Sequence, residues 1–270
     1  MTTTTDPATV GPRPAAALGA GRAGYREALW SEWTKFATLR STRVLAAGLG
    51  AALPVFAVVV AATGSLQSDD TILGASLLGG AVLAQVLAAV LGAGLITGEF
   101  KTGMIRVTLA ACPRRLVVLA AKATVAAGVV FAVTLVSAAA AFGIGLVMLD
   151  GDSYATGDAW PALIGVALAI SSIAVLGLGI GTVVRHPAGA VTAAIGVVLL
   201  PGLLAPLLGD SQRWLGGASL NGVMQKLTES SDATPETVGS LGAWPSLGVV
   251  AVYTVAAVLA AVRVLRHRDT

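Results

Sequence analysis

The chain has 270 residues, of which 56% are hydrophobic and only 11% charged, with a formal net charge of +3 and a mean hydropathy of +0.84. Soluble domains usually have about 25% charged residues, so this composition excludes an ordinary soluble protein. The apolar runs lack the alternating polar positions of barrel strands, which excludes a membrane β-barrel. The basic residues lie beside apolar runs rather than on a polar surface, which argues against nucleic acid as a partner. We therefore expect an all-α membrane protein.

The first residues differ in composition from the rest of the chain. Residues 1–20 are rich in Thr, Pro and Ala and have no apolar core like that of a signal peptide. We expect them to form a disordered cytosolic tail, and residues 21–270 to form one membrane domain. The single cysteine, Cys112, excludes an intramolecular disulfide, and we interpret it as a structural thiol.

Six apolar runs are long enough to cross a bilayer, which takes about 20 residues per helix. The expected spans are 44–64, 73–97, 116–149, 161–184, 188–209 and 245–265. The third is longer than a bilayer requires, so its helix should tilt or project beyond the membrane. In the fifth, Pro201 and Pro206 should break the helix near the outer leaflet.

Charges alternate between the connections, and cytoplasmic connections are those enriched in Lys and Arg. On the side of the two chain ends, the basic residues are Arg13, Arg22, Arg26, Lys35, Arg40, Arg43, Lys101, Arg106, Arg114, Arg115, Arg185, Arg263, Arg266 and Arg268. On the other side, acidic residues prevail: Asp69, Asp70, Asp150, Asp152, Asp158, Asp210, Glu229, Asp232 and Glu236, against Arg213 and Lys226. This bias predicts that both termini are cytoplasmic and that the number of spans is even.

A helix is expected at residues 25–40, ahead of the first span. Its apolar residues recur at helical spacing: Tyr25, Leu29, Trp33 and Phe36, with Trp30 and Leu39 at the margins. Trp and Tyr favour the membrane interface, although Glu32 falls inside this apolar arc. We prefer a helix that lies along the cytoplasmic membrane surface; the alternative is a cytosolic extension of the first span.

The segment 98–115 is the most informative part of the chain. It is too polar to span a membrane, yet it contains Met104, Ile105, Val107 and Leu109. A short helix at the membrane surface that docks into a partner protein would use both properties, and Pro113 would end it. The alternative is a hairpin connection whose arginines only set the topology, and composition does not decide between the two.

Polar residues within the spans have structural interpretations. Lys122 lies about two turns from the cytosolic edge, and we expect its ammonium to extend to the interface or to pair with Glu99. Further polar groups stand near mid-span, where hydrogen bonds between helices are expected: Gln85, Ser137, Ser171 and Ser172. We expect no catalytic residues, because the spans hold no nucleophile-base pair or paired carboxylates, and no metal ligands, because they hold no ligand cluster.

Several stretches, in this order, resemble the membrane subunit of ABC exporters of the ABC-2 type, especially the actinobacterial permeases. The first is Ser31-Glu-Trp-Thr-Lys-Phe-Ala-Thr-Leu-Arg-Ser-Thr-Arg43, which is similar to that family's N-terminal elbow helix. The second, Gly98-Glu-Phe-Lys-Thr-Gly-Met-Ile-Arg106 with Thr108-Leu-Ala-Ala-Cys-Pro-Arg-Arg115, is similar to its coupling segment. Ala121-Lys122 and Arg185-His-Pro-Ala-Gly-Ala190 fit the same pattern. The resemblance covers roughly Tyr25 to Arg268.

The resemblance implies a permease half in a bacterial cell membrane that pairs with a second copy or a related chain. Each half would contact a cytosolic ATPase subunit, two in all, which would bind ATP and Mg²⁺. The implied elbow residues are Trp30, Glu32, Trp33, Lys35 and Phe36. The implied coupling residues are Glu99, Lys101, Thr102, Gly103, Met104, Arg106, Arg114 and Arg115. The sequence has no Gly-x-x-x-x-Gly-Lys-Ser/Thr phosphate loop, so we expect this chain to bind no cofactor and to have no ATPase site of its own.

Three classes of function remain open. The first is an ATP-driven exporter, whose substrate would be lipophilic, such as a drug or antibiotic, because its path would be lined by Ala, Val and Leu. The second is a non-transporting membrane protein, such as an immunity factor or a sensor. The third, an ion-coupled secondary transporter, is disfavoured because His186 and His267 lie at cytosolic ends and no acidic residue stands at mid-span.

Overall fold

A computed structural model describes residues 24–63, 71–112, 114–149 and 154–267. Within these ranges the chain forms helices joined by short connections, and no strand. Six helices are long and apolar enough to cross a membrane. The chain is therefore a multi-pass α-helical membrane protein. The expected tail, residues 1–20, lies outside the described residues.

The elements follow one another as a series of long helices and short connecting helices. In chain order they are α1 (Tyr25–Thr38), α2 (Arg40–Thr63), α3 (Ile72–Thr102), α4 (Met104–Ala111), α5 (Arg115–Met148), α6 (Ala159–Val184), α7 (Pro187–Leu204), the 3₁₀ helix η1 (Ala205–Ser211), α8 (Gln212–Ala218), α9 (Leu220–Leu227), α10 (Pro235–Val238) and α11 (Ala243–His267).

The six expected spans correspond to α2, α3, α5, α6, α7 and α11 and are confirmed. Two of the spans differ in detail from the sequence expectation. α3 continues to Thr102 rather than ending at residue 97. α7 runs through Pro201 but ends at Leu204, before Pro206, and η1 contains the non-helical Gly209 (φ 52°). The fifth span, Pro187–Gly209, thus agrees with the expected range; it passes from α-helix to 3₁₀ helix one residue before Pro206 and loses helical geometry at Gly209.

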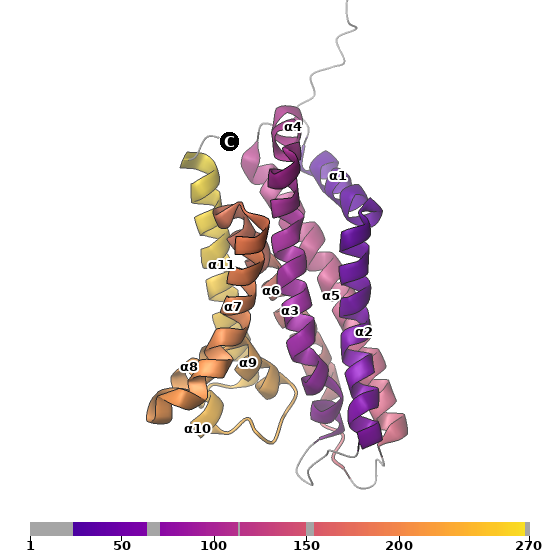
Figure 1. The fold of residues 1–270 in the computed structure, drawn as a ribbon. Helices are drawn as coiled ribbons and strands as arrows, with labels where there is room; N and C mark the ends of the chain where they lie inside the picture. The colour runs from indigo at the N-terminus through magenta and orange to yellow at the C-terminus, as the bar shows by residue number, and fades with distance from the viewer. Residues whose placement is uncertain (1–23, 64–70, 113, 150–153, 268–270) are drawn as a thin grey trace, which may run out of the picture.

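The long helices form a bundle around two central helices, α3 and α6 (Figure 1). α2 and α5 pack on one flank, whereas α7 and α11 lie on the other. α1, α4 and the last turns of α11 lie at one end, which we call the α4 end, and α8, α9 and α10 lie at the opposite end (Figure 1). An even number of spans returns the chain to the end where it began.

Glycines let the two central helices approach each other closely. A Cβ at Gly92 of α3 would lie 1.8 Å from the carbonyl oxygen of Ala174, and one at Gly177 of α6 would lie 2.4 Å from that of Ala89. Both distances are far shorter than a van der Waals contact, so only glycine fits there. Small residues serve this purpose in membranes, where helix association depends on tight packing rather than on exclusion from water.

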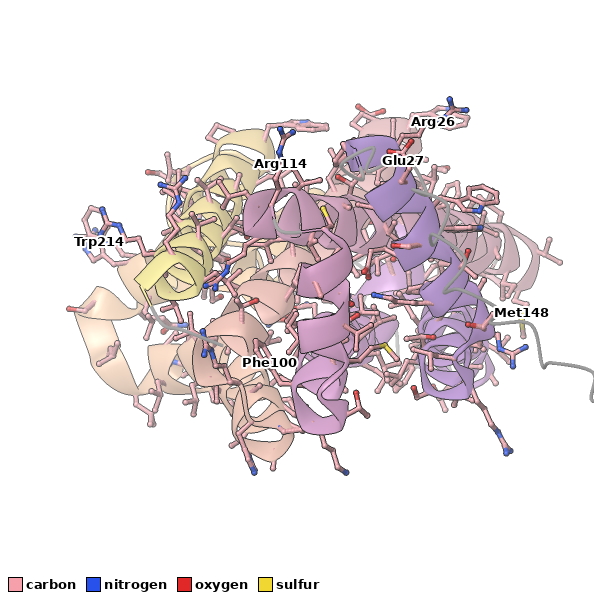
Figure 2. All side chains as sticks on the ribbon, turned by 90° about the horizontal axis from the view of Figure 1, so that it is seen from above. Arg26, Glu27, Phe100, Arg114, Met148 and Trp214 are labelled. Carbon is pink, nitrogen blue, oxygen red and sulfur yellow. The ribbon has the colours of Figure 1, made fainter. Side chains whose placement is uncertain are left out.

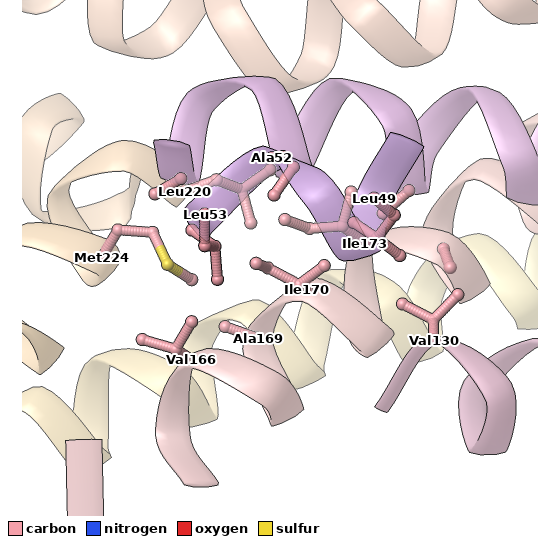
Figure 3. Close-up of a cluster of buried hydrophobic side chains, with 14 of the residues drawn as sticks. Leu49, Ala52, Leu53, Val130, Val166, Ala169, Ile170, Ile173, Leu220 and Met224 are labelled. Carbon is pink, nitrogen blue, oxygen red and sulfur yellow. The ribbon is translucent and has the colours of Figure 1, made fainter. Parts of the chain in front are cut away.

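Side chains from distant parts of the sequence meet in the core. Figure 3 shows Leu53 of α2, Ile170 of α6 and Met224 of α9 directed toward one another. All three are fully buried. The short helix α9 therefore contributes to the core of the bundle at the end opposite α4.

α1 is a separate helix and not an extension of the first span. Leu39 between α1 and α2 is extended (φ −72°, ψ 124°), which interrupts the helical path. α1 then packs mainly on α5 rather than on α2. Its position along a membrane surface remains a prediction.

Candidate functional site

Four charged side chains meet at the α4 end of the bundle. Glu32 and Lys35 come from α1, Glu99 from α3 and Lys122 from α5. Lys35 Nζ lies 2.7 Å from Glu32 Oε1 and 2.8 Å from Glu99 Oε1. Lys122 Nζ lies 3.0 Å from Glu99 Oε1 and also donates to Glu32 Oε2. Each ammonium thus contacts both carboxylates, and we call this group the four-charge cluster.

The four-charge cluster is shielded from solvent. The side chains of Glu32, Glu99 and Lys122 are 4%, 8% and 2% exposed, and only Lys35, at 25%, reaches the surface. An unpaired charge in such a place would cost several kcal/mol, roughly 3–5 when one partner of a buried pair is removed. Two positive and two negative charges compensate one another here, so the cluster is neutral as a whole.

The pKa of Lys35 reflects this balance. Burial lowers the pKa of its ammonium, but hydrogen bonds to Glu32 and Glu99 and the attraction of both carboxylates outweigh burial. The pKa therefore lies above its ordinary value of 10.5. Lys35 is positively charged throughout the physiological pH range.

The helical period of α1 explains why a glutamate occupies its apolar arc. Ala28, Glu32 and Phe36 are buried and spaced by four residues, so they form one stripe that faces the bundle. Trp30 and Trp33, in contrast, are 71% and 47% exposed. Sequence periodicity predicted the helix. The structure shows that its buried face contains Glu32, which contacts Lys122.

A short helix connects to the four-charge cluster. α3 ends at Thr102, and the left-handed conformation of the next residue, Gly103 (φ 72°), turns the chain directly into α4. Lys35 Nζ lies 3.4 Å from Thr108 Oγ1 of α4, so the same ammonium that binds the carboxylates also contacts this helix. Met104 and Val107 of α4 are 44% and 69% exposed. The short helix expected in segment 98–115 is confirmed; its docking into a partner stays a prediction.

The other residues that the resemblance implies for coupling lie outside the four-charge cluster. Lys101 and Thr102, in the last turn of α3, are exposed, as is Arg114 before α5. Figure 2, seen from above, shows Arg114 toward the upper edge of the α4 end. Arg115 donates from Nη1 to the backbone oxygen of Leu265 and so ties α5 to α11. The side chain of Arg106 lies outside the described part of the structure.

The polar residues within the spans differ in the partners that they contact. The pairing of Lys122 with Glu99 is confirmed. Ser137 Oγ donates to the carbonyl oxygen of Gly50 at 2.8 Å and links α5 to α2, as expected. Two other serines bond within their own helix, so the expectation of interhelical bonds was wrong for Ser171 and Ser172. For the buried Gln85, no described residue is a partner of Nε2.

Sequence reasoning missed two contacts at this end. Glu32 was not recognised as a partner of Lys122, although a glutamate in an apolar arc and a lysine in an apolar span both require a counter-charge. Arg185, which has φ 60° at the end of α6, places its guanidinium 5.3 Å from the ring centre of Phe100 in α3. This cation–π contact joins the central helices where they leave the bundle, and Figure 2 marks Phe100 there.

Neither a scan of protein-family models nor a search among curated proteins finds a match for this chain. In the part of the chain that the structure describes, no group of three or more His, Cys, Asp or Glu side chains is placed to hold a metal ion.

Proposed function

We propose that the chain is the membrane subunit of an ATP-driven exporter of the ABC-2 type, whose ATPase resides on separate polypeptides. The observation that supports this most is the construction of the α4 end. There a short helix with exposed apolar residues is joined, through the four-charge cluster, to helices that run the length of the bundle. This is the arrangement that a coupling element requires.

The exposed face of α4 provides the docking surface in this proposal. Met104 and Val107 are apolar and accessible, which suits insertion into a groove of a partner. Lys101 and Arg114 stand exposed at the two ends of the α4 segment and would meet acidic residues on the rim of that groove. The partner is an ATPase subunit, one for each of two permease copies.

In this proposal, a movement of α4 is transmitted to the spans through two connections. α4 follows α3 across a single residue, Gly103, and the 31 residues of α3 extend roughly 46 Å at 1.5 Å per residue. The four-charge cluster binds α1 and α5 to that same end of α3. Because the ion pairs are buried and neutral as a set, these helices would move together rather than separate.

The distribution of charge supports a cytoplasmic position for α4. Basic residues gather at the α4 end, whereas the opposite end has more acidic than basic residues among those described. By the positive-inside rule the α4 end faces the cytoplasm, where ATP is available. Both chain termini lie on that side in the proposal, and the membrane is that of a bacterial cell.

The transported substrate is proposed to be lipophilic, such as a drug or an antibiotic. The spans present mainly Ala, Val, Leu and Gly, a surface that gives an ion or a sugar few hydrogen-bonding partners. The export path would run between two copies of the chain.

Co-purification with an ATPase tests the proposal. The chain is isolated in a mild detergent from its native membrane, and associated proteins are identified by mass spectrometry and assayed for ATP hydrolysis. We expect an associated chain with a phosphate-binding loop, and we expect Met104→Glu and Val107→Glu to abolish its association. Leu241→Glu is the matched control, because Leu241 is 54% exposed at the opposite end.

The results separate the classes of function. An ATPase that stays associated with both α4 variants would remove the role of α4. If no ATPase accompanies the chain in any preparation, the exporter proposal fails, and a non-transporting immunity factor or sensor becomes the better hypothesis.

A further inference from the structure

A groove lies between α1 and the exposed face of α5. Its volume is about 1160 Å³, slightly above the roughly 300–1,000 Å³ of ordinary ligand pockets. α1 crosses α5 at the polar end of the groove, where Tyr25 Oη donates to Thr124 Oγ1 at 2.8 Å. We call this space the α1–α5 groove.

The floor of the groove is one apolar face of α5. Val125, Val129 and Val133 repeat every four residues, and Gly128 and Ala132 lie beside them. From Val125 to Val133 this face extends about 12 Å along α5, toward the middle of the span. At Gly128 a Cβ would meet no atom within 4 Å, so the missing side chain leaves the groove open. Such a floor is apolar and runs along α5 toward the middle of the span, so a hydrocarbon chain can lie along it.

The other wall places charged and aromatic groups at the polar end. Arg26 and Glu27 both line the groove, and Figure 2 places them at the outer rim of the α4 end. Glu27 Oε2 accepts from the backbone N–H of Gly24 at 2.9 Å, whereas none of the described residues is a hydrogen-bond or ion-pair partner of Arg26. Trp30 and Trp33 stand exposed along the same wall, as aromatic residues do at membrane interfaces.

We propose that the α1–α5 groove binds one phospholipid of the phosphatidylethanolamine type. Arg26 binds the phosphate, for which guanidinium geometry is well suited, and Glu27 binds the ammonium of the head group. One acyl chain lies along α5 over Gly128. The neighbouring positive and negative charges match a zwitterionic head group, whereas an anionic head group would leave Glu27 uncompensated. This site is independent of the proposed export function, since it needs only the bilayer.

Native mass spectrometry of the full chain tests the site. Protein in detergent is titrated with phosphatidylethanolamine and, separately, with phosphatidylglycerol of the same acyl chains. We expect one phosphatidylethanolamine to bind more tightly than phosphatidylglycerol. Equal binding, or a preference for phosphatidylglycerol, would overturn the assignment of the head group.

Substitutions separate the acyl chain from the head group. Gly128→Leu fills the floor and removes the contacts of about two methylene groups, which corresponds to roughly a tenfold loss of affinity. Gly143→Leu is the control, because it lies on the same helix, also has open space at its Cβ, and does not line the groove. Arg26→Gln should weaken binding roughly tenfold, and Arg40→Gln, exposed at the start of α2, should not. Equal effects of target and control variants contradict the proposal.

A measurement on the unchanged chain covers the case in which Gly128→Leu fails to fold. The protein in vesicles receives phosphatidylethanolamine with a photoreactive group on one acyl chain. We expect labelling of residues 125–133 above that of the exposed face of α11, which represents ordinary contact with lipid. Labelling at the same level on both helices would show that the groove holds no specific lipid, and a photocrosslink to a second copy would show that protein occupies it.

Discussion

Replacing Lys122 by Met removes one of the two positive charges of the four-charge cluster and keeps a side chain of similar length. Glu32 and Glu99 would then share only the ammonium of Lys35. The cluster changes from neutral to a net charge of −1, in a place where the two carboxylates are 4% and 8% exposed.

The size of the effect follows from burial. Breaking a buried ion pair by removing one partner costs about 3–5 kcal/mol. Lys35 still contacts both carboxylates and is a quarter exposed, so water and the remaining pair reduce the loss. We therefore expect Lys122→Met to lower the free energy of unfolding by about 3 kcal/mol, the low end of that range. That loss corresponds to roughly a hundredfold change in the folding equilibrium.

A second substitution restores the balance of charge. Adding Glu99→Gln to Lys122→Met leaves the pair of Lys35 and Glu32, whose atoms are 2.7 Å apart. An ion pair replaced as a unit by neutral groups is often near neutral in stability, so the double variant should lose only about 1 kcal/mol. A double-mutant cycle with Glu99→Gln alone isolates the interaction between the two positions.

Reversible unfolding of the purified protein by sodium dodecyl sulfate, followed by circular dichroism, measures these free energies. Lys101→Met, an exposed lysine two residues after Glu99, should change stability by no more than about 0.5 kcal/mol. The reasoning is refuted if Lys122→Met costs less than about 1 kcal/mol. It is equally refuted if the double variant is no more stable than Lys122→Met.

Three further predictions concern thermal unfolding of the purified protein. Gly92→Ala should lower the unfolding midpoint because its Cβ would overlap the Ala174 carbonyl. Gly94→Ala has open space at its Cβ and should keep or raise the midpoint, since Ala favours helix by roughly 1 kcal/mol over Gly. Equal effects of the two substitutions would contradict the α3–α6 packing. Gln85→Met should leave the midpoint unchanged or raise it, because no described residue is a partner of its buried Nε2, and a clear loss would reveal a bond that the structure lacks. The contribution of Lys35 to stability should be complete below pH 10.5, the ordinary pKa of the group, and should decline as the pH rises through its higher folded-state pKa. Lys35→Met should remove this alkaline loss of stability. If the loss persists in Lys35→Met, another group causes it.

The sequence alone determined which segments cross the membrane. An apolar run of about 20 residues has no stable place in water, so length and hydropathy identify a span without reference to its neighbours. The same local logic predicted the helix at residues 25–40 and an interruption of the fifth span near its two prolines, whereas for segment 98–115 composition left a short helix and a plain hairpin connection both open. Each depends on backbone chemistry or hydrophobicity within a few residues.

Tertiary structure decided which faces and charges meet. Periodicity placed Glu32 and Trp33 on one helix, but only packing against α5 showed that Glu32 is buried against Lys122, 90 residues away, while Trp33 stays 47% exposed. Gly92 and Gly94 are equivalent in sequence, yet only Gly92 contacts α6. A sequence pattern specifies which residues share a face, whereas the partner of that face depends on how distant helices pack, and buried charges can be matched only after that packing is known.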